Sequence, residues 1–243
     1  MLATVHAESV AFLGDSLTAG QGVPAEQSYP ALVGVALAAD AATARWTAVN
    51  AGVSGDTSAG GLRRIDWVLK GKPRLVVIAL GANDGLRGLA VEQLEANLRG
   101  VVAKVRAAGA TPLLVGMRMP KNLGPEYAGR FDALYPRLAA ELQLPFLPFL
   151  LDGVALKPEL NQADMIHPNA DGHALIARNV AAWLKPLLPA ASDQQAAASN
   201  QRPATSDQRP AASDQQAAAS NQRPATSDQR PAASDQQAAA TTP

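Results

Sequence analysis

The feature that most constrains the fold of this chain is an alternation between short, continuous apolar segments and longer segments with helical spacing. The clearest apolar segment, residues 75–80, holds six apolar residues in a row after Pro73 and before Gly81. Strands with no polar alternation are typical of a parallel sheet that is covered on both faces. Further strands are expected at residues 10–13, 47–50, 113–116 and 146–150.

The segments between these strands carry apolar residues at helical spacing. In residues 91–108 an apolar stripe runs from Leu94 to Val105, and Gly109 ends the helix. The sequence therefore predicts an α/β fold in which helices cover a parallel sheet. Ligands of such folds bind at the carboxyl ends of the strands. Further helices are expected at residues 29–39, 62–69, 126–143 (interrupted, or starting, near Pro136) and 170–188.

A seven-residue repeat begins at Ser192 and runs to the end of the sequence. It offers no Leu, Ile, Val or aromatic side chain for a coiled-coil seam. Its prolines, among them Pro203 and Pro210, each cost a helix about 3 kcal/mol. We therefore expect one folded domain over residues 8–189 and a disordered low-complexity tail over 190–243. The tail is either without function, a spacer or a partner-binding segment.

Composition excludes several classes of protein. Lys plus Arg and Asp plus Glu are both 21, so the net charge of zero argues against binding to nucleic acid or to anionic membranes. No stretch approaches the length of about 18 apolar residues needed for an integral membrane segment. The chain has no cysteine, which excludes disulfides, thiolate metal sites and a Cys nucleophile. No cluster of metal ligands stands out, so we expect neither metal nor cofactor.

Polar side chains gather in the loops that follow the predicted strands. These loops contain Gly14-Asp15-Ser16, Ser54-Gly55-Asp56 and Asn83-Asp84-Gly85, and the segment from Asp164 to His167 precedes the last helix. Each is an ordinary turn sequence when taken alone. Together they bring one Ser, one Gly, one Asn and an Asp-x-x-His pair to the edge of the sheet where ligands bind.

This set of residues suits nucleophilic catalysis. The hydroxyl of Ser16 needs a base to take its proton, and the imidazole of His167 suits that task. The carboxylate of Asp164 can orient the ring and stabilise the imidazolium. Backbone N–H groups of Ser16 and Gly55 and the side-chain amide of Asn83 would serve as oxyanion donors. Loss of one such donor typically costs about 2.7–4 kcal/mol in the transition state.

These four blocks, in this order, resemble those of the GDSL/SGNH hydrolase family over residues 9 to about 188. Residues 83–88 and 144–149 further resemble a bacterial subgroup of multifunctional acyl-CoA thioesterases, arylesterases and lysophospholipases. The resemblance implies a flavodoxin-like three-layer α/β/α fold. It also implies a Ser16, His167 and Asp164 triad, and an oxyanion hole of Ser16, Gly55 and Asn83.

The implied activity is hydrolysis of acyl thioesters, aryl or short-to-medium-chain carboxylic esters, or lysophospholipids through a covalent acyl-enzyme. The alternatives are a carbohydrate O-acetylesterase and a non-catalytic binding module that uses the tail. Members of the subgroup are typically exported, so we expect a periplasmic protein whose signal peptide is missing here, with a cytoplasmic protein as the alternative. The expected partner is a small-molecule substrate, and the expected state is a monomer.

Other residues are assigned to the surroundings of the site. Asp84, Gly85 and Leu86 lie in the loop after the third predicted strand, and Met117 follows the fourth. We expect these four residues to line an acyl pocket. His173 lies in the last predicted helix and is expected to be an ordinary, partly exposed residue.

Overall fold

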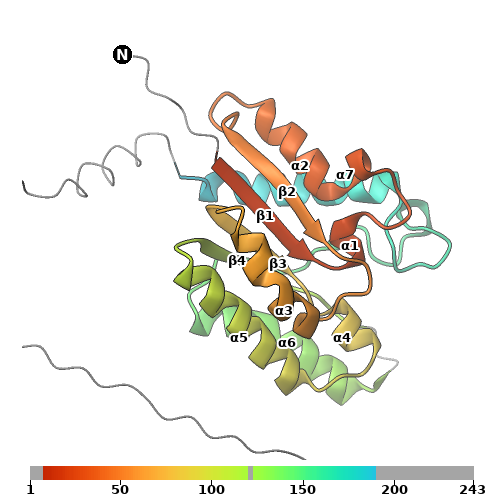
Figure 1. Cartoon of the computed structure of the whole chain (residues 1–243). Coiled ribbons are helices and arrows are strands. Elements are labelled where there is room, and N and C mark those ends of the chain that lie inside the picture. Colours follow the sequence, from red (N-terminus) through yellow and green to blue (C-terminus); the bar gives the residue numbers. More distant parts are fainter. Residues whose placement is uncertain (1–7, 120–122, 190–243) are drawn as a thin grey trace, which may run out of the picture. The chain divides into compact units, whose positions relative to one another are not determined.

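The computed structural model describes residues 8–119 and 123–189, so the predicted tail lies outside the described residues. Five parallel strands form one sheet in the order β2-β1-β3-β4-β5 (Figure 1). This confirms the prediction of a parallel central sheet of about five strands. The strands are β1 (Glu8–Gly14), β2 (Trp46–Gly52), β3 (Leu75–Ala79), β4 (Thr111–Val115) and β5 (Phe146–Leu147).

Helices cover both faces of the sheet, which gives the three-layer arrangement that the sequence predicts. One face carries α2 (Tyr29–Ala38) and α7 (Ala170–Leu184), which pack against each other. The opposite face carries α3 (Ser58–Leu69), α5 (Val91–Ala107) and α6 (Pro125–Glu141). The short helices are α1 (Ser16–Ala19) and α4 (Ala82–Leu86), together with single 3-10 turns at Ala25–Gln27, Pro158–Leu160 and Lys185–Leu187.

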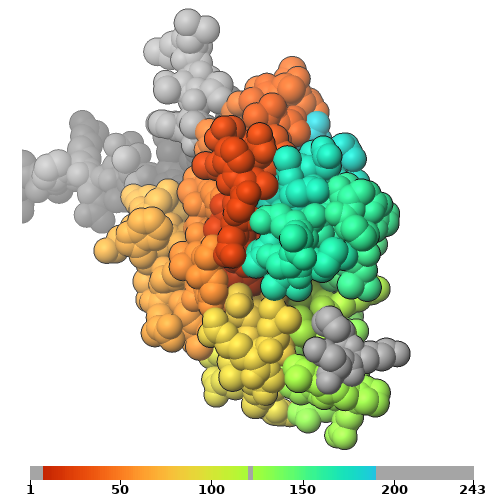
Figure 2. All heavy atoms as spheres, turned by 90° about the vertical axis from the view of Figure 1, so that its right-hand side faces the viewer, coloured from red at the N-terminus to blue at the C-terminus, as the bar shows by residue number. Residues whose placement is uncertain are grey.

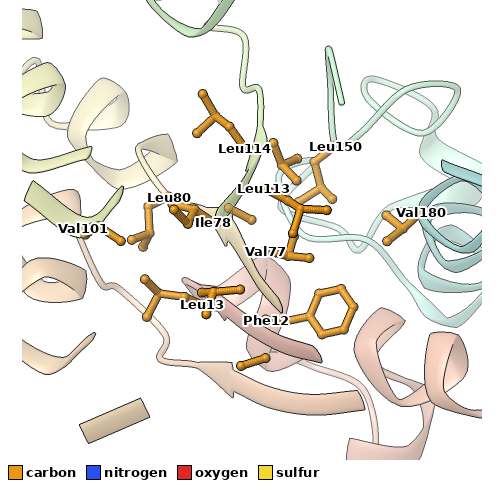
Figure 3. Close-up of a cluster of buried hydrophobic side chains, with 14 of the residues drawn as sticks. Phe12, Leu13, Val77, Ile78, Leu80, Val101, Leu113, Leu114, Leu150 and Val180 are labelled. Atoms are coloured by element: carbon orange, nitrogen blue, oxygen red, sulfur yellow. The ribbon is translucent and has the colours of Figure 1, made fainter. Parts of the chain in front are cut away.

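The core lies on both sides of the sheet because successive strand residues point to opposite faces. Phe12 points toward the layer that holds Val180 of α7, whereas Leu13 points toward the layer that holds Val101 of α5 (Figure 3). All four side chains are fully buried. This two-sided burial explains why the strands read as unbroken apolar segments.

The helix α6 differs from the sequence expectation. It is continuous from Pro125 to Glu141, with Pro136 inside it, and is neither interrupted nor started there. Proline removes one helical hydrogen bond at a cost of about 3 kcal/mol. Burial of Phe131, Tyr135 and Leu138 on the same helix face offsets that cost.

The strand order places the carboxyl ends of three strands side by side. Gly14 of β1 is paired with Gly52 of β2 on one side and with Ala79 of β3 on the other. The chain leaves β1 between two strands whose connections run in opposite directions, which is the switch point where ligands bind in such sheets. In the part of the chain that the structure describes, no helix has the length and apolar character needed to cross a membrane.

Candidate active site

The chain turns directly from β1 into the short helix α1, and Ser16 is the first residue of that helix. The side chain of Asp15 caps α1, since its Oδ1 accepts the Leu17 N–H at 3.0 Å. Gly14 is required at the turn because a Cβ there would lie 1.9 Å from Thr18 Oγ1. The strand end and the cap together fix the position of the Ser16 hydroxyl.

The structure brings Ser16, His167 and Asp164 into one hydrogen-bonded chain. Ser16 Oγ lies 2.9 Å from His167 Nε2, and His167 Nδ1 lies 2.7 Å from Asp164 Oδ2. Asp164 Oδ1 accepts the backbone N–H groups of Ile166 and His167, both at 3.0 Å. The carboxylate thus holds both the backbone and the ring of the loop that carries His167.

The contacts of Asp164 and His167 determine which atoms of these three side chains carry protons. The hydrogen bond from His167, aided by the two backbone N–H groups, lowers the pKa of Asp164 to about 2. An ionised carboxylate only accepts hydrogen bonds, so His167 Nδ1 carries the proton. In this tautomer the lone pair of His167 Nε2 faces the Ser16 hydroxyl and can accept its proton.

Asn83 and Gly55 lie on two neighbouring loops that are tied together. Asn83, in α4, donates a hydrogen bond from Nδ2 to the carbonyl of Asp56 at 3.0 Å. Gly55 has a φ of +78°, which favours glycine, and its carbonyl accepts from Arg87 Nη2 at 2.8 Å. Asn83 has a second amide hydrogen for a ligand and lines the same cavity as Ser16.

The prediction for Asp84 and Gly85 is wrong, because neither residue lines the cavity. Asp84 is buried, and its carboxylate accepts the Ser58 hydroxyl at 2.5 Å and the Ser58 N–H at 2.8 Å. Asn97 of α5 donates to the same hydroxyl at 2.9 Å. Gly85 faces the side chain of Met119, whose Sδ would lie 2.4 Å from a Cβ at that position. Asp84 therefore joins α4, α3 and α5 behind Asn83.

A cavity of about 370 Å³ opens beside Ser16, and both Leu86 and Met117 line it. Figure 2 shows the face of the molecule where the segments around Ser16, α4 and residues 150–168 meet. Leu156 and Met165 also line the cavity, and both have positive φ, at +63° and +61°. Non-glycine residues rarely adopt this strained conformation, and it concentrates at functional sites.

Arg64 of α3 is a part of the site that sequence reasoning missed. Its guanidinium donates to the carbonyls of Gly14 at 2.8 Å and Ala51 at 2.7 Å, and to the Asp56 carboxylate at 2.6 Å. It thereby connects the ends of β1 and β2 to the loop that anchors Asn83. The pair of Asp56 and Arg64, about two helical turns apart in sequence, is the only signal that pointed to it.

The expectation for His173 is wrong as well. Its ring is fully buried, stacks on Tyr29 with 6.5 Å between ring centroids, and accepts the Tyr29 N–H at Nδ1 over 3.3 Å. Burial lowers the pKa of His173 to about 4, so the ring is neutral at physiological pH. The packing of α7 on α2, which sequence periodicity does not locate, explains the difference.

A parallel α/β sheet with a serine, a histidine and a carboxylate at its carboxyl edge, beside an apolar cavity, defines a serine-dependent acyl hydrolase. The profile of the GDSL-like Lipase/Acylhydrolase family matches residues 12–175. The chain belongs to this family, and it is an esterase.

Curated relatives and a solved structure agree with this assignment. The chain is 44% identical to thioesterase 1/protease 1/lysophospholipase L1 of Escherichia coli over 75% of the chain and 86% of that protein. It is also 44% identical to esterase TesA of Pseudomonas aeruginosa, over 75% of the chain and 90% of the relative. A crystal structure of TesA superposes with a TM-score of 0.70 at 43% identity, covering 74% of this chain and all of that one.

Proposed function

We propose that Ser16 is the nucleophile, His167 the general base and Asp164 the group that orients the base. Ser16 Oγ attacks the substrate carbonyl carbon while His167 Nε2 takes the hydroxyl proton. The tetrahedral intermediate collapses, and the leaving alcohol or thiol departs with the proton from Nε2. Water then hydrolyses the acyl-enzyme by the same route. The observation that carries this proposal is the 2.9 Å contact between Ser16 and His167, backed by Asp164.

The proposed oxyanion hole consists of the N–H groups of Ser16 and Gly55 and the amide of Asn83. The position of Ser16 at the start of α1 supports its part, because N–H groups at a helix start have no partner within the helix. The anchoring of Asn83 on the Asp56 carbonyl supports its part, since a donor held in advance stabilises developing charge at no cost of reorganisation.

The proposed substrates are acyl thioesters, aryl esters, and lysophospholipids, which the names of the relatives mention. The cavity supports an acyl chain, because its lining is largely apolar. Leu86, Leu156 and Ile166 add exposed apolar side chains to that lining, at 49%, 77% and 46% exposure. A carbohydrate O-acetylesterase would instead need polar groups that contact sugar hydroxyls, so we favour acyl-chain substrates.

A substrate panel combined with active-site labelling tests the proposal. Purified protein is assayed with p-nitrophenyl butyrate, acyl-CoAs, lysophospholipid and acetylated xylan, and is then treated with a serine-directed phosphonate. We expect turnover of the acyl-chain substrates and a single phosphonyl adduct on Ser16 by mass spectrometry. Turnover of acetylated xylan alone would favour the O-acetylesterase, and an unlabelled Ser16 would overturn the triad.

We also propose that residues 8–189 form the catalytic domain, that the protein is a monomer and that it works in the periplasm. The match of the family profile to residues 12–175 supports the domain, and the resemblance to an exported subgroup supports the location. A chain that ends at residue 189 should keep its melting temperature and activity. Light scattering near 25 kDa for the full chain, and esterase in the periplasmic fraction of the source cells, are the expected results.

A further inference from the structure

Arg118 is the one permanently charged residue among the described residues that line the cavity. The other lining residues are apolar or uncharged polar residues, apart from the imidazole of His167, and none is an Asp or Glu. The cavity beside Ser16 therefore combines walls that suit an acyl chain with a single fixed positive charge. A cavity that binds only neutral esters has no need of that charge.

Among residues 8–119 and 123–189, the guanidinium of Arg118 has an aromatic contact and no hydrogen-bonded N–H group. Its central carbon lies 5.2 Å from the centroid of the Phe149 ring, and Phe149 lines the same cavity. Contact with the face of an aromatic ring restrains the guanidinium through its π surface. The five N–H donors point outward around the edge of the plane, where a ligand can reach them.

Arg118 also differs from the arginines nearby because no acceptor for it lies in the described part of the chain. Arg64 binds the Asp56 carboxylate and Arg87 binds the Gly55 carbonyl, so both hold loops of the site. Within residues 8–119 and 123–189, neither a carboxylate nor a carbonyl accepts a hydrogen bond from Arg118, which is exposed. An exposed, oriented guanidinium with free donors suits bidentate binding of an oxyanion such as phosphate.

We propose that Arg118 binds the phosphate of the leaving group when the substrate is an acyl-CoA or a lysophospholipid. This inference rests on the proposed function and names the part of the substrate that the charge recognises. The acyl chain is uncharged, so the negative charge of these substrates lies on the group that departs. Arg118 thus favours phosphate-bearing esters and thioesters over neutral esters with the same acyl chain.

The experiment compares three octanoyl substrates that differ in the leaving group: p-nitrophenyl octanoate, octanoyl-CoA and monomeric octanoyl lysophosphatidate. The variants are Arg118→Gln and the charge-preserving Arg118→Lys. Arg178→Gln serves as the matched control, because Arg178 is an exposed arginine of α7 that does not line the cavity. The melting temperature of each variant shows that it is folded.

In Arg118→Gln we expect kcat/KM for the phosphate-bearing substrates, relative to the neutral ester, to fall about tenfold, mainly through KM. In Arg118→Lys this ratio should lie between those of Arg118→Gln and the wild type, because Lys keeps the positive charge but loses the bidentate donor geometry of the guanidinium. The preference of the wild type should weaken with added salt, and that of Arg118→Gln should not. Arg178→Gln should match the wild type.

An unchanged ratio in Arg118→Gln, or an equal loss on all three substrates, would overturn the inference while the proposed function stands. A wild type that hydrolyses none of the three would instead overturn the proposed function. The two charged arms identify the source of the phosphate. A ratio that falls for octanoyl-CoA alone assigns Arg118 to the CoA leaving group, and a ratio that falls for lysophosphatidate alone assigns it to the lipid headgroup.

Discussion

At the scale of single residues, the proposed chemistry depends on two groups that lie 151 residues apart in sequence and 2.9 Å apart in space. Replacing Ser16 with Ala removes the hydroxyl and leaves the Asp15 cap of α1 in place. We expect kcat to fall by at least about a thousandfold, because the triad acts as a unit. The melting temperature should change little, since one partly solvated hydrogen bond is lost. Ester hydrolysis and calorimetry measure the two effects.

The control for this change is Ser54→Ala, which removes an exposed serine from the neighbouring loop. It should keep full activity. The absence of phosphonate labelling shows that the Ser16→Ala preparation contains no wild-type enzyme. Substantial turnover by such a preparation would refute the assignment of the nucleophile.

Leu156 illustrates strain at a single residue. It is 77% exposed and has a φ of +63°, a conformation that costs a non-glycine residue about 1–2 kcal/mol. Asn tolerates that region, so Leu156→Asn should raise the free energy of unfolding by about 0.5–1 kcal/mol. The same change removes an apolar side chain from the cavity wall, so KM for an octanoyl ester should rise.

Urea unfolding and steady-state kinetics of Leu156→Asn test both effects. Leu123→Asn is a suitable control, because Leu123 is also exposed but neither lines the cavity nor has a positive φ. A Leu156→Asn protein that is less stable than the wild type would contradict the argument from strain.

At the scale of secondary-structure elements, Arg64 connects the ends of β1 and β2 to the Asp56 loop through three short hydrogen bonds. Arg64→Met keeps the length of the side chain and loses all three contacts. The expected loss is about 1–3 kcal/mol of unfolding free energy, moderated by water at the 20%-exposed side chain. Displacement of the Asn83 anchor should also lower kcat at least about tenfold.

Arg63→Met is the matched control, since Arg63 is the adjacent, exposed arginine of the same helix. It should leave kcat and stability within error of the wild type. A normal kcat in Arg64→Met, despite a lower melting temperature, would show that Arg64 supports the fold and not the geometry of the site.

The elements themselves could be predicted well because buried strands and amphipathic helices leave periodic patterns. The same patterns fail where tertiary packing decides. Pro136 reads as a break, yet burial of Phe131 and Tyr135 keeps α6 continuous. Asp84 reads as a loop residue at the pocket, yet the hydroxyl of Ser58, brought close by the fold, draws it into the interior. Contacts between distant segments carry no local signal, so the role of Asp84 needed the structure. The spacing of Asp56 and Arg64 hints at their ion pair, but it does not reveal that Arg64 also binds the ends of β1 and β2.

At the scale of the whole molecule, two buried titratable groups outside the triad act on stability in opposite directions. Burial raises the pKa of Asp15 from 3.8 to about 6, and burial lowers the pKa of His173 from 6.5 to about 4. Each group is neutral in the folded protein over most of the interval between these values. The unfolded chain, in contrast, ionises Asp15 above 3.8 and protonates His173 below 6.5.

The signs follow from which state binds more protons. Asp15 keeps its proton to a higher pH in the folded state than in the unfolded state. Its contribution to stability is therefore complete below pH 3.8 and is lost as the pH rises through about 6. As the pH falls, His173 binds a proton in the unfolded state at a higher pH than in the folded state. Its contribution to stability is therefore complete above pH 6.5 and is lost as the pH falls through about 4. Asp164, with a pKa lowered to about 2, loses its contribution only below this interval.

The two slopes therefore oppose each other between about pH 4 and 6.5, and single variants should separate them. Asp15→Asn keeps an oxygen that can cap α1, and its free energy of unfolding should fall on acidification from pH 6.5 to 4.5, by up to about 2 kcal/mol. His173→Asn keeps an acceptor for the Tyr29 N–H, and its stability should rise over the same change. Urea unfolding at both pH values measures the slopes, and the wild type should lie between the variants. If the free energy of unfolding changed equally with pH in all three proteins, Asp15 and His173 would not determine how stability depends on pH.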